Sequence, residues 1–135
     1  MYCSISDLQQ RFDADELLDL APQKTDPTKL DMLRLSKACA DAAEEIDSYA
    51  GRRYTLPIAS CSAVLTGYAC DIARYRLHTD RMPENVRKRY EDALKWLADV
   101  AAGRVVLVGA ELLNAATPGG SVVVKQSTSV FNRVI

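Results

Sequence analysis

The stretch Tyr68-Ala-Cys-Asp-Ile-Ala-Arg-Tyr-Arg-Leu77 decides the fold of this 135-residue chain, because its helical pattern leaves little surface for water. At about 100° per residue, one face carries Leu65, Tyr68, Ala69, Ile72 and Tyr75, and much of the rest is Ala63, Cys70, Ala73 and Leu77. Polar residues share one strip, formed by Gly67, Asp71, Arg74 and His78. A helix over residues 62–79 that is apolar on most sides is a core helix, so we expect the other elements to wrap around it.

Two short helices are expected before this core helix. Ser6 with Gln9 has the spacing of a capping box and opens the first, and Asp13 with Glu16 repeats the spacing for the second. The prolines of residues 21–27 then interrupt any continuous helix.

Two long helices are also predicted, each with apolar residues three and four positions apart. The first runs from Asp26-Pro27, an N-cap and first-turn pair, to Gly51, and the second runs from Pro83 to Gly103. The chain therefore reads as a mostly α, single-domain bundle of four to five helices around a central buried helix. We place this helical domain at residues 1–103.

Residues 104–135 have a different character and form a C-terminal extension. The valine-rich runs 105–108 and 121–125 are separated by Pro118-Gly119-Gly120, and the last twenty or so residues have no periodic face. Such a segment is an extended arm able to form β-strands, either on a partner's sheet edge or as a strand pair on its own bundle. Its candidate partner-binding residues are Val122, Val123, Val124, Val130, Phe131 and Ile135.

Composition and charge limit the class of protein. The chain is 48% hydrophobic with a net charge of −1, and it has neither a membrane-length apolar run nor a secretory signal at its N-terminus, so we expect no membrane and a cytosolic site of synthesis. Residues 1–50 hold five Lys/Arg and eleven Asp/Glu, and residues 51–104 hold ten and six. This asymmetry fits head-to-tail stacking of copies, or simply the solvated faces of a bundle.

Residues that would support catalysis or a cofactor are scarce. His78 is the only histidine, and it sits at the polar end of the core helix, where a capping or solvated role outweighs that of a general base. The four cysteines, Cys3, Cys39, Cys61 and Cys70, lack the Cys-x-x-Cys spacing that a metal or redox site would favour. Cys39 and Cys70 lie among alanines and are interpreted as small core residues. Asp71 and Arg74, three apart, are expected to form a structural pair. We therefore expect no enzyme activity, metal or cofactor.

A basic cluster around the last interhelical turn keeps a nucleic-acid-binding regulator as the alternative function. Its members are Arg81, Arg87, Lys88 and Arg89, and Arg52-Arg53 forms a second pair. Long flanking helices and a slightly acidic chain argue against a helix-turn-helix, whose second helix is short and follows a tight turn.

The order of several short motifs resembles the Mu-like phage head–tail adaptor family, which is also found in prophages. The motifs are Tyr2 with Ser6-Asp-Leu-x-x-Arg-Phe12, Asp15-Glu-Leu17, Ala42-x-x-Glu-Ile-Asp-Ser-Tyr49, Gly51-Arg-x-Tyr-x-Leu-Pro57, Tyr68 to Leu77, and Val86-x-x-Arg-Tyr-x-x-Ala-x-x-Trp-Leu97 with Ala102-Gly103. Together they cover about residues 1–103, and it is their order and spacing that are specific.

This resemblance implies a ring subunit of the virion neck, assembled in the bacterial host cytoplasm. The implied partners are the portal protein, a tail-side neck protein and further copies of the chain, twelve in a ring, with DNA passing through without sequence-specific binding. The predicted subunit interface is Arg52, Arg53, Arg81 and Trp96. The predicted channel-facing acids are Asp41, Glu44 and Glu45, which would repel DNA phosphates so that the DNA slides.

Overall fold

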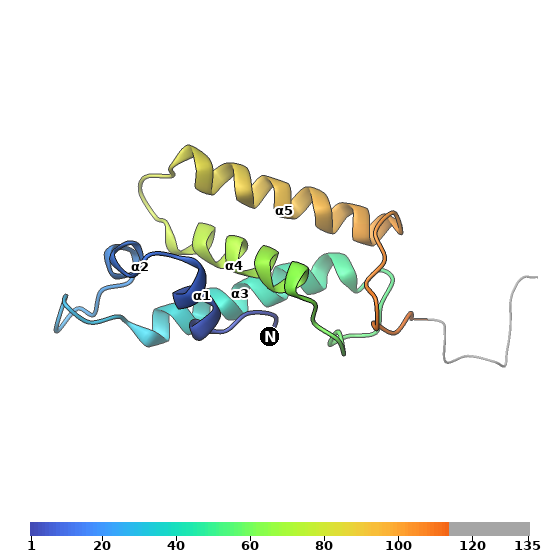
Figure 1. The fold of residues 1–135 in the computed structure, drawn as a ribbon, viewed down its shortest axis with the longest axis horizontal. Helices are drawn as coiled ribbons and strands as arrows, with labels where there is room; N and C mark the ends of the chain where they lie inside the picture. The colour runs from blue at the N-terminus through green and yellow to red at the C-terminus, as the bar shows by residue number, and fades with distance from the viewer. Residues whose placement is uncertain (114–135) are drawn as a thin grey trace, which may run out of the picture.

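The computed structural model describes residues 1–113, which contain five α-helices joined by loops. They are α1 (Ile5–Arg11), α2 (Ala14–Leu20), α3 (Met32–Ala50), α4 (Ala63–Leu77) and α5 (Glu84–Ala102). Figure 1 shows α3, α4 and α5 running along one another with α4 in the middle, while α1 and α2 pack at the end where α3 begins. Within these residues the β-structure is limited to two isolated bridges. The predicted mostly α bundle is confirmed.

Helix α4 is the core helix that the sequence predicts. Its side chains that face α3, α5 and α1 are at most 2% exposed, namely Leu65, Ala69, Cys70, Ile72, Ala73 and Leu77. The Ser62 side chain accepts a hydrogen bond from the Leu65 amide and fixes the start of the helix. Burial of α4 on several sides therefore organises the whole bundle.

Two predicted helix starts are wrong. Helix α3 begins at Met32 instead of following Asp26-Pro27, because Asp31 supplies the N-cap and accepts from the Arg34 amide. Asp26 instead accepts from the amide and hydroxyl of Thr28 and holds a turn in the connecting loop. Helix α1 likewise opens with Ser4 in a capping box, in place of the predicted Ser6.

Helix α5 ends where the sequence predicts. Gly103 has a φ of 84°, the left-handed conformation that favours glycine, and the Arg53 guanidinium packs directly against it. A Cβ at this position would lie 2.7 Å from the Arg53 Nη1. Arg53 and Gly103 therefore join the C-terminal ends of α3 and α5.

The chain stays packed on the helices after α5. Leu107 is buried, and its amide donates to the Tyr54 hydroxyl over 3.0 Å. The Thr55 amide donates to the Glu111 carbonyl, and the Leu113 amide donates to the Arg53 carbonyl. Residues 104–113 are thus packed against the helices, and the division into a helical domain (1–103) and a C-terminal extension (104–135) stays a prediction.

The helices of residues 1–113 do not combine the length and the apolar character that crossing a bilayer requires.

Candidate interaction surfaces

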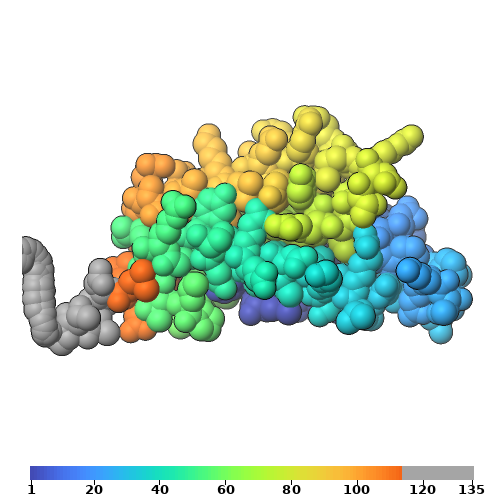
Figure 2. Space-filling view, turned by 180° about the vertical axis from the view of Figure 1, so that it is seen from behind, coloured from blue at the N-terminus to red at the C-terminus, as the bar shows by residue number. Residues whose placement is uncertain are grey.

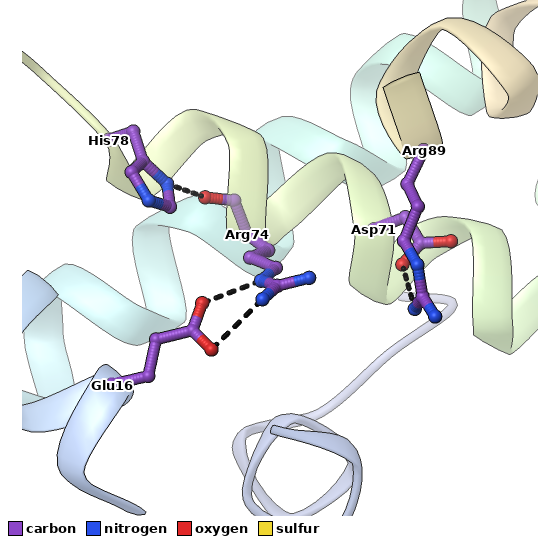
Figure 3. A network of polar contacts seen from close by, with 5 residues as sticks. All are labelled: Glu16, Asp71, Arg74, His78 and Arg89. Atoms are coloured by element: carbon purple, nitrogen blue, oxygen red, sulfur yellow. Dashed lines mark hydrogen bonds and ion pairs between the residues drawn. The ribbon is translucent and has the colours of Figure 1, made fainter. Parts of the chain in front are cut away.

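The polar strip of α4 ties this helix to its neighbours. Arg74 donates from Nε and Nη2 to the two carboxylate oxygens of Glu16 on α2, at 2.6 and 2.9 Å (Figure 3). Its guanidinium also lies over the Phe12 ring. Asp71 points the other way and pairs with Arg89 of α5 at 3.5 Å (Figure 3). The predicted Asp71–Arg74 pair is therefore wrong, because each side chain finds a partner on a different helix.

Asp71, Arg74 and His78 each interact with another group of the bundle. Burial raises the pKa of Asp71, while the nearby Arg89 acts against that rise. The Nδ1 of His78 lies 3.0 Å from the Arg74 carbonyl, as Figure 3 shows, so this ring is held at the end of α4. Within residues 1–113, no three His, Cys, Asp or Glu side chains are grouped as a metal ion would require.

Glu45, one of the predicted channel-facing acids, joins α3, α4 and α5. Its carboxylate accepts from Arg76 and from the Tyr90 hydroxyl, both at 2.6 Å, and its side chain is only 13% exposed. The Tyr90 ring stacks on Tyr75 with centroids 3.7 Å apart. Burial and the Glu45 hydrogen bond raise the pKa of Tyr90, and the same carboxylate raises the pKa of Arg76.

The other two predicted channel acids lie more openly on α3. Glu44 is exposed and Asp41 is half-buried, 4.0 Å from Lys37. Of the three residues, Glu44 is therefore the one with a carboxylate most open to a partner. The channel role itself stays a prediction.

The four predicted interface residues do not form one patch. Arg52 is exposed and Arg53 half-buried at the C-terminal end of α3, whereas Arg81 is exposed in the turn between α4 and α5. Trp96 lies between them on α5 and stacks on Tyr68 of α4 with centroids 4.8 Å apart. A 19-residue α5 separates its two ends by about 28 Å at 1.5 Å per residue, so any shared interface would involve opposite ends of neighbouring copies.

The basic cluster of the nucleic-acid alternative is largely paired. Arg87 contacts Glu84, Lys88 lies 3.8 Å from Asp92, and Arg89 binds Asp71. Intramolecular pairing of this kind reduces the positive potential offered to a phosphate backbone.

Sequence reasoning missed the role of Arg34. Its Nε donates to the Leu20 carbonyl at 3.1 Å and its Nη2 donates to the Leu77 carbonyl at 2.9 Å. One guanidinium therefore satisfies carbonyls at the C-terminal ends of both α2 and α4, which lack helical partners there. No local signal reveals this, because the three residues are far apart in the chain.

A second missed feature is that three of the four thiols are buried in the same hydrophobic core. Cys3, Cys39 and Cys70 are buried, while Cys61 is exposed. Hydrogen bonding with Cys39 and Cys70, together with burial, raises the pKa of the Cys3 thiol. The predicted role of Cys39 and Cys70 as small core residues is consistent with this burial, although the sequence did not indicate that Cys3 joins them in the core.

The two ends of the bundle carry contrasting surfaces. Between α2 and the turn after α4 lies an open hollow of about 550 Å³, lined by Asp19, Leu20, Leu77, His78, Thr79, Asp80, Arg81 and Pro83. At the other end, exposed apolar side chains follow α5, with Val106 68% and Val108 85% exposed. Figure 2 shows that residues 51–60 and 104–113 lie at one end of the elongated molecule and residues 14–31 at the other. The predicted arm residues, Val122 to Ile135, lie outside the described residues.

Together these observations define a small helical protein in which ion pairs join the helices, with a hollow at one end and exposed apolar side chains at the other. A family model described as "Bacteriophage Mu, Gp36" matches residues 2–126, so the chain belongs to this bacteriophage family.

Two curated relatives agree with this assignment. The chain is 31% identical over 134 residues to "Gene product J" of Escherichia phage Mu, which covers 98% of this chain and 94% of that protein. It is 42% identical over 78 residues to the "Mu-like prophage FluMu protein gp36" of Haemophilus influenzae, covering 58% of this chain. The chain spans about half (55%) of the length of that Haemophilus protein.

Proposed function

We propose that the chain is a phage head–tail adaptor, a ring subunit that links the portal to the tail and continues the DNA channel. The observation that carries the proposal is the family match over residues 2–126, which takes in the whole helical bundle and enters the C-terminal extension. The motif order resembles that of the phage head–tail adaptor family, and this resemblance supports a role in neck assembly. The role is mechanical and needs no catalytic group or cofactor.

The distribution of polar groups supports a mechanical role. Three ion pairs join different helices, namely Arg74 with Glu16, Asp71 with Arg89, and Glu45 with Arg76. Such pairs hold a bundle in one shape, whereas the open surfaces are at its ends. A rigid unit with contact surfaces at both ends suits a subunit that is packed laterally between neighbours.

Removing the gene from the phage or prophage that encodes the chain tests the proposal. We expect DNA-filled heads and complete tails to accumulate separately, and a plasmid copy of the gene to restore joined particles. Joined, infective particles formed in the absence of the chain would refute the adaptor role.

The same assay tests the proposed arm. A chain truncated after Ala116 is expected to leave heads and tails unjoined, because the arm would dock on the portal or a neighbouring copy. Normal yields of joined particles with the truncated chain would refute the arm's role and leave the adaptor proposal standing.

The nucleic-acid alternative has its own signature. A DNA-binding regulator would be retained on DNA with an affinity that falls steeply as salt is raised. We expect no such retention at physiological salt, and strong salt-sensitive retention would favour the alternative.

A further inference from the structure

The hollow at one end of the bundle has a mixed lining of apolar and polar residues, and its exposed charged members form its rim. Leu20 at the end of α2 and Leu77 at the end of α4 supply apolar lining, and Asp19, Asp80 and Arg81 are exposed around it. At about 550 Å³ the hollow is large enough for side chains of another molecule together with their backbone.

Val106 and Val108 form a projection at the opposite end. They flank the buried Leu107, whose amide is fixed to the Tyr54 hydroxyl at 3.0 Å, and they precede Gly109, which has a φ of 86°. Because the backbone between them is anchored, the two valines are held in solvent without the freedom of a loose loop. Preorganised apolar groups of this kind lose little entropy when they bind.

The hollow and the projection cannot meet within one copy. Pro83 lines the hollow and precedes α5, whereas the projection follows Gly103, and the helix between them is about 28 Å long. A contact between them must therefore join two copies through different surfaces. Repeated contacts of this type produce a ring when the rotation closes.

The charges at the two ends favour this pairing. Asp19 and Asp80 form no ion pair within residues 1–113, and Arg52, at the end that carries the projection, forms none there either. On the rim, the two carboxylates of Asp19 and Asp80 outnumber the single guanidinium of Arg81, so the summed formal charge of these three side chains is negative. Docking would bring this rim towards the end of the neighbour that carries Arg52, Arg53 and Glu111, whose formal charges sum to +1, and such complementarity fixes orientation.

We propose that a second copy of this chain inserts its Val106 and Val108 side chains into the hollow. The occupant is another copy because exposed apolar side chains, a hollow at the opposite end and opposite formal charges at the two ends are all present on this same chain. The proposal deepens the proposed function, on which it rests for the lateral contact between ring neighbours, by assigning the two surfaces of that contact. Each copy gives one projection and receives one, so the interface is head-to-tail.

Purified full-length protein tests the assignment by concentration-dependent NMR. The projection variant is Val106→Asp with Val108→Asp, and the hollow variant is Thr79→Trp with Asp80→Arg, which fills and reverses the rim. Val64→Asp is the matched control, because it places the same charge on another exposed valine, 56% exposed and on α4.

In the wild-type chain we expect the amides of residues 78–81 and 105–109 to shift as concentration rises to about 1 mM, which detects even a millimolar Kd. Each interface variant should raise the Kd about tenfold or more, while Val64→Asp leaves it unchanged. The amide dispersion of each spectrum reports directly that the variant has folded.

Mixing the variants gives the decisive result. Labelled projection variant, which keeps its hollow, should shift only at residues 78–81 when unlabelled hollow variant is added, and the mixture should stop at a dimer. The absence of wild-type shifts up to about 1 mM, shifts confined to other residues, or a mixture that does not restore binding would each overturn the proposal. Head–tail joining is measured in a separate assay. A negative result here would therefore refute the proposed interface and leave the adaptor proposal standing.

Discussion

Removing the side chain of Ile72 tests whether α4 is the buried centre of the bundle. Ile72 is fully buried on the helix that packs against α3 and α5 together. Truncating such a residue to alanine costs about 2–5 kcal/mol, made up of lost transfer free energy and the cavity that remains. Because helices enclose α4 on opposite sides and limit collapse, we expect Ile72→Ala to cost about 4 kcal/mol, in the upper half of that range.

Urea unfolding followed by circular dichroism measures this loss. With a slope of about 1–3 kcal/mol per molar urea, the midpoint should fall by more than about 1 M. Ile72→Val deletes a single methyl group and should cost only about 0.5–1.5 kcal/mol. The graded series therefore reports packing around the side chain rather than a general sensitivity of the helix.

Val64→Ala on the same helix is the control for this series. Val64 is 56% exposed, so its truncation should change stability by no more than about 0.5 kcal/mol. If Ile72→Ala cost no more than Val64→Ala, α4 would not be enclosed as described and the reasoning would fail.

Three further predictions concern other parts of the bundle. Arg34→Ala should lower the unfolding free energy by about 2–3 kcal/mol in the same urea assay, because the carbonyls of Leu20 and Leu77 lose a charged donor; a loss below about 0.5 kcal/mol would contradict that role. In the native protein iodoacetamide should label the exposed Cys61 first, as mass spectrometry would detect, while rapid labelling of Cys3 would show that this thiol is not buried as described. Burial and the hydrogen bond to Asp47 raise the pKa of Tyr2 to about 12, so the folded state holds this proton longer than the unfolded state and stability should fall as pH rises from about 10 to 12. Tyr2→Phe should flatten that fall, and an unchanged pH profile would count against it.

The helices were predictable where their signals are local. Residues 62–79 are apolar on most sides of a helix and include a capping serine. The bounds of the observed α4 differ from the predicted ones by one or two residues at each end. The end of α5 was predictable because Gly103 adopts the left-handed conformation that ends a helix, and glycine at that single position is a local signal. The prediction of where α3 begins failed because Asp26 and Asp31 can both cap a helix. The folded loop, and not the local sequence, selects Asp31.

Side-chain partners were much less predictable. Spacing along one helix suggested Asp71 with Arg74, whereas Arg74 binds Glu16, fifty-eight positions away. Sequence periodicity assigns a residue to a face but does not say which neighbour meets it. The hollow was missed for the same reason, since it forms only when residues 19–20 and 77–83 come together.

Imaging the neck of intact particles tests the adaptor role most directly. Cryo-electron microscopy of particles from the phage that encodes this chain should show a ring of five-helix bundles between portal and tail, each with α4 enclosed by its neighbours. A neck fully explained by other proteins, with this chain absent from the purified particle, would contradict the proposed function.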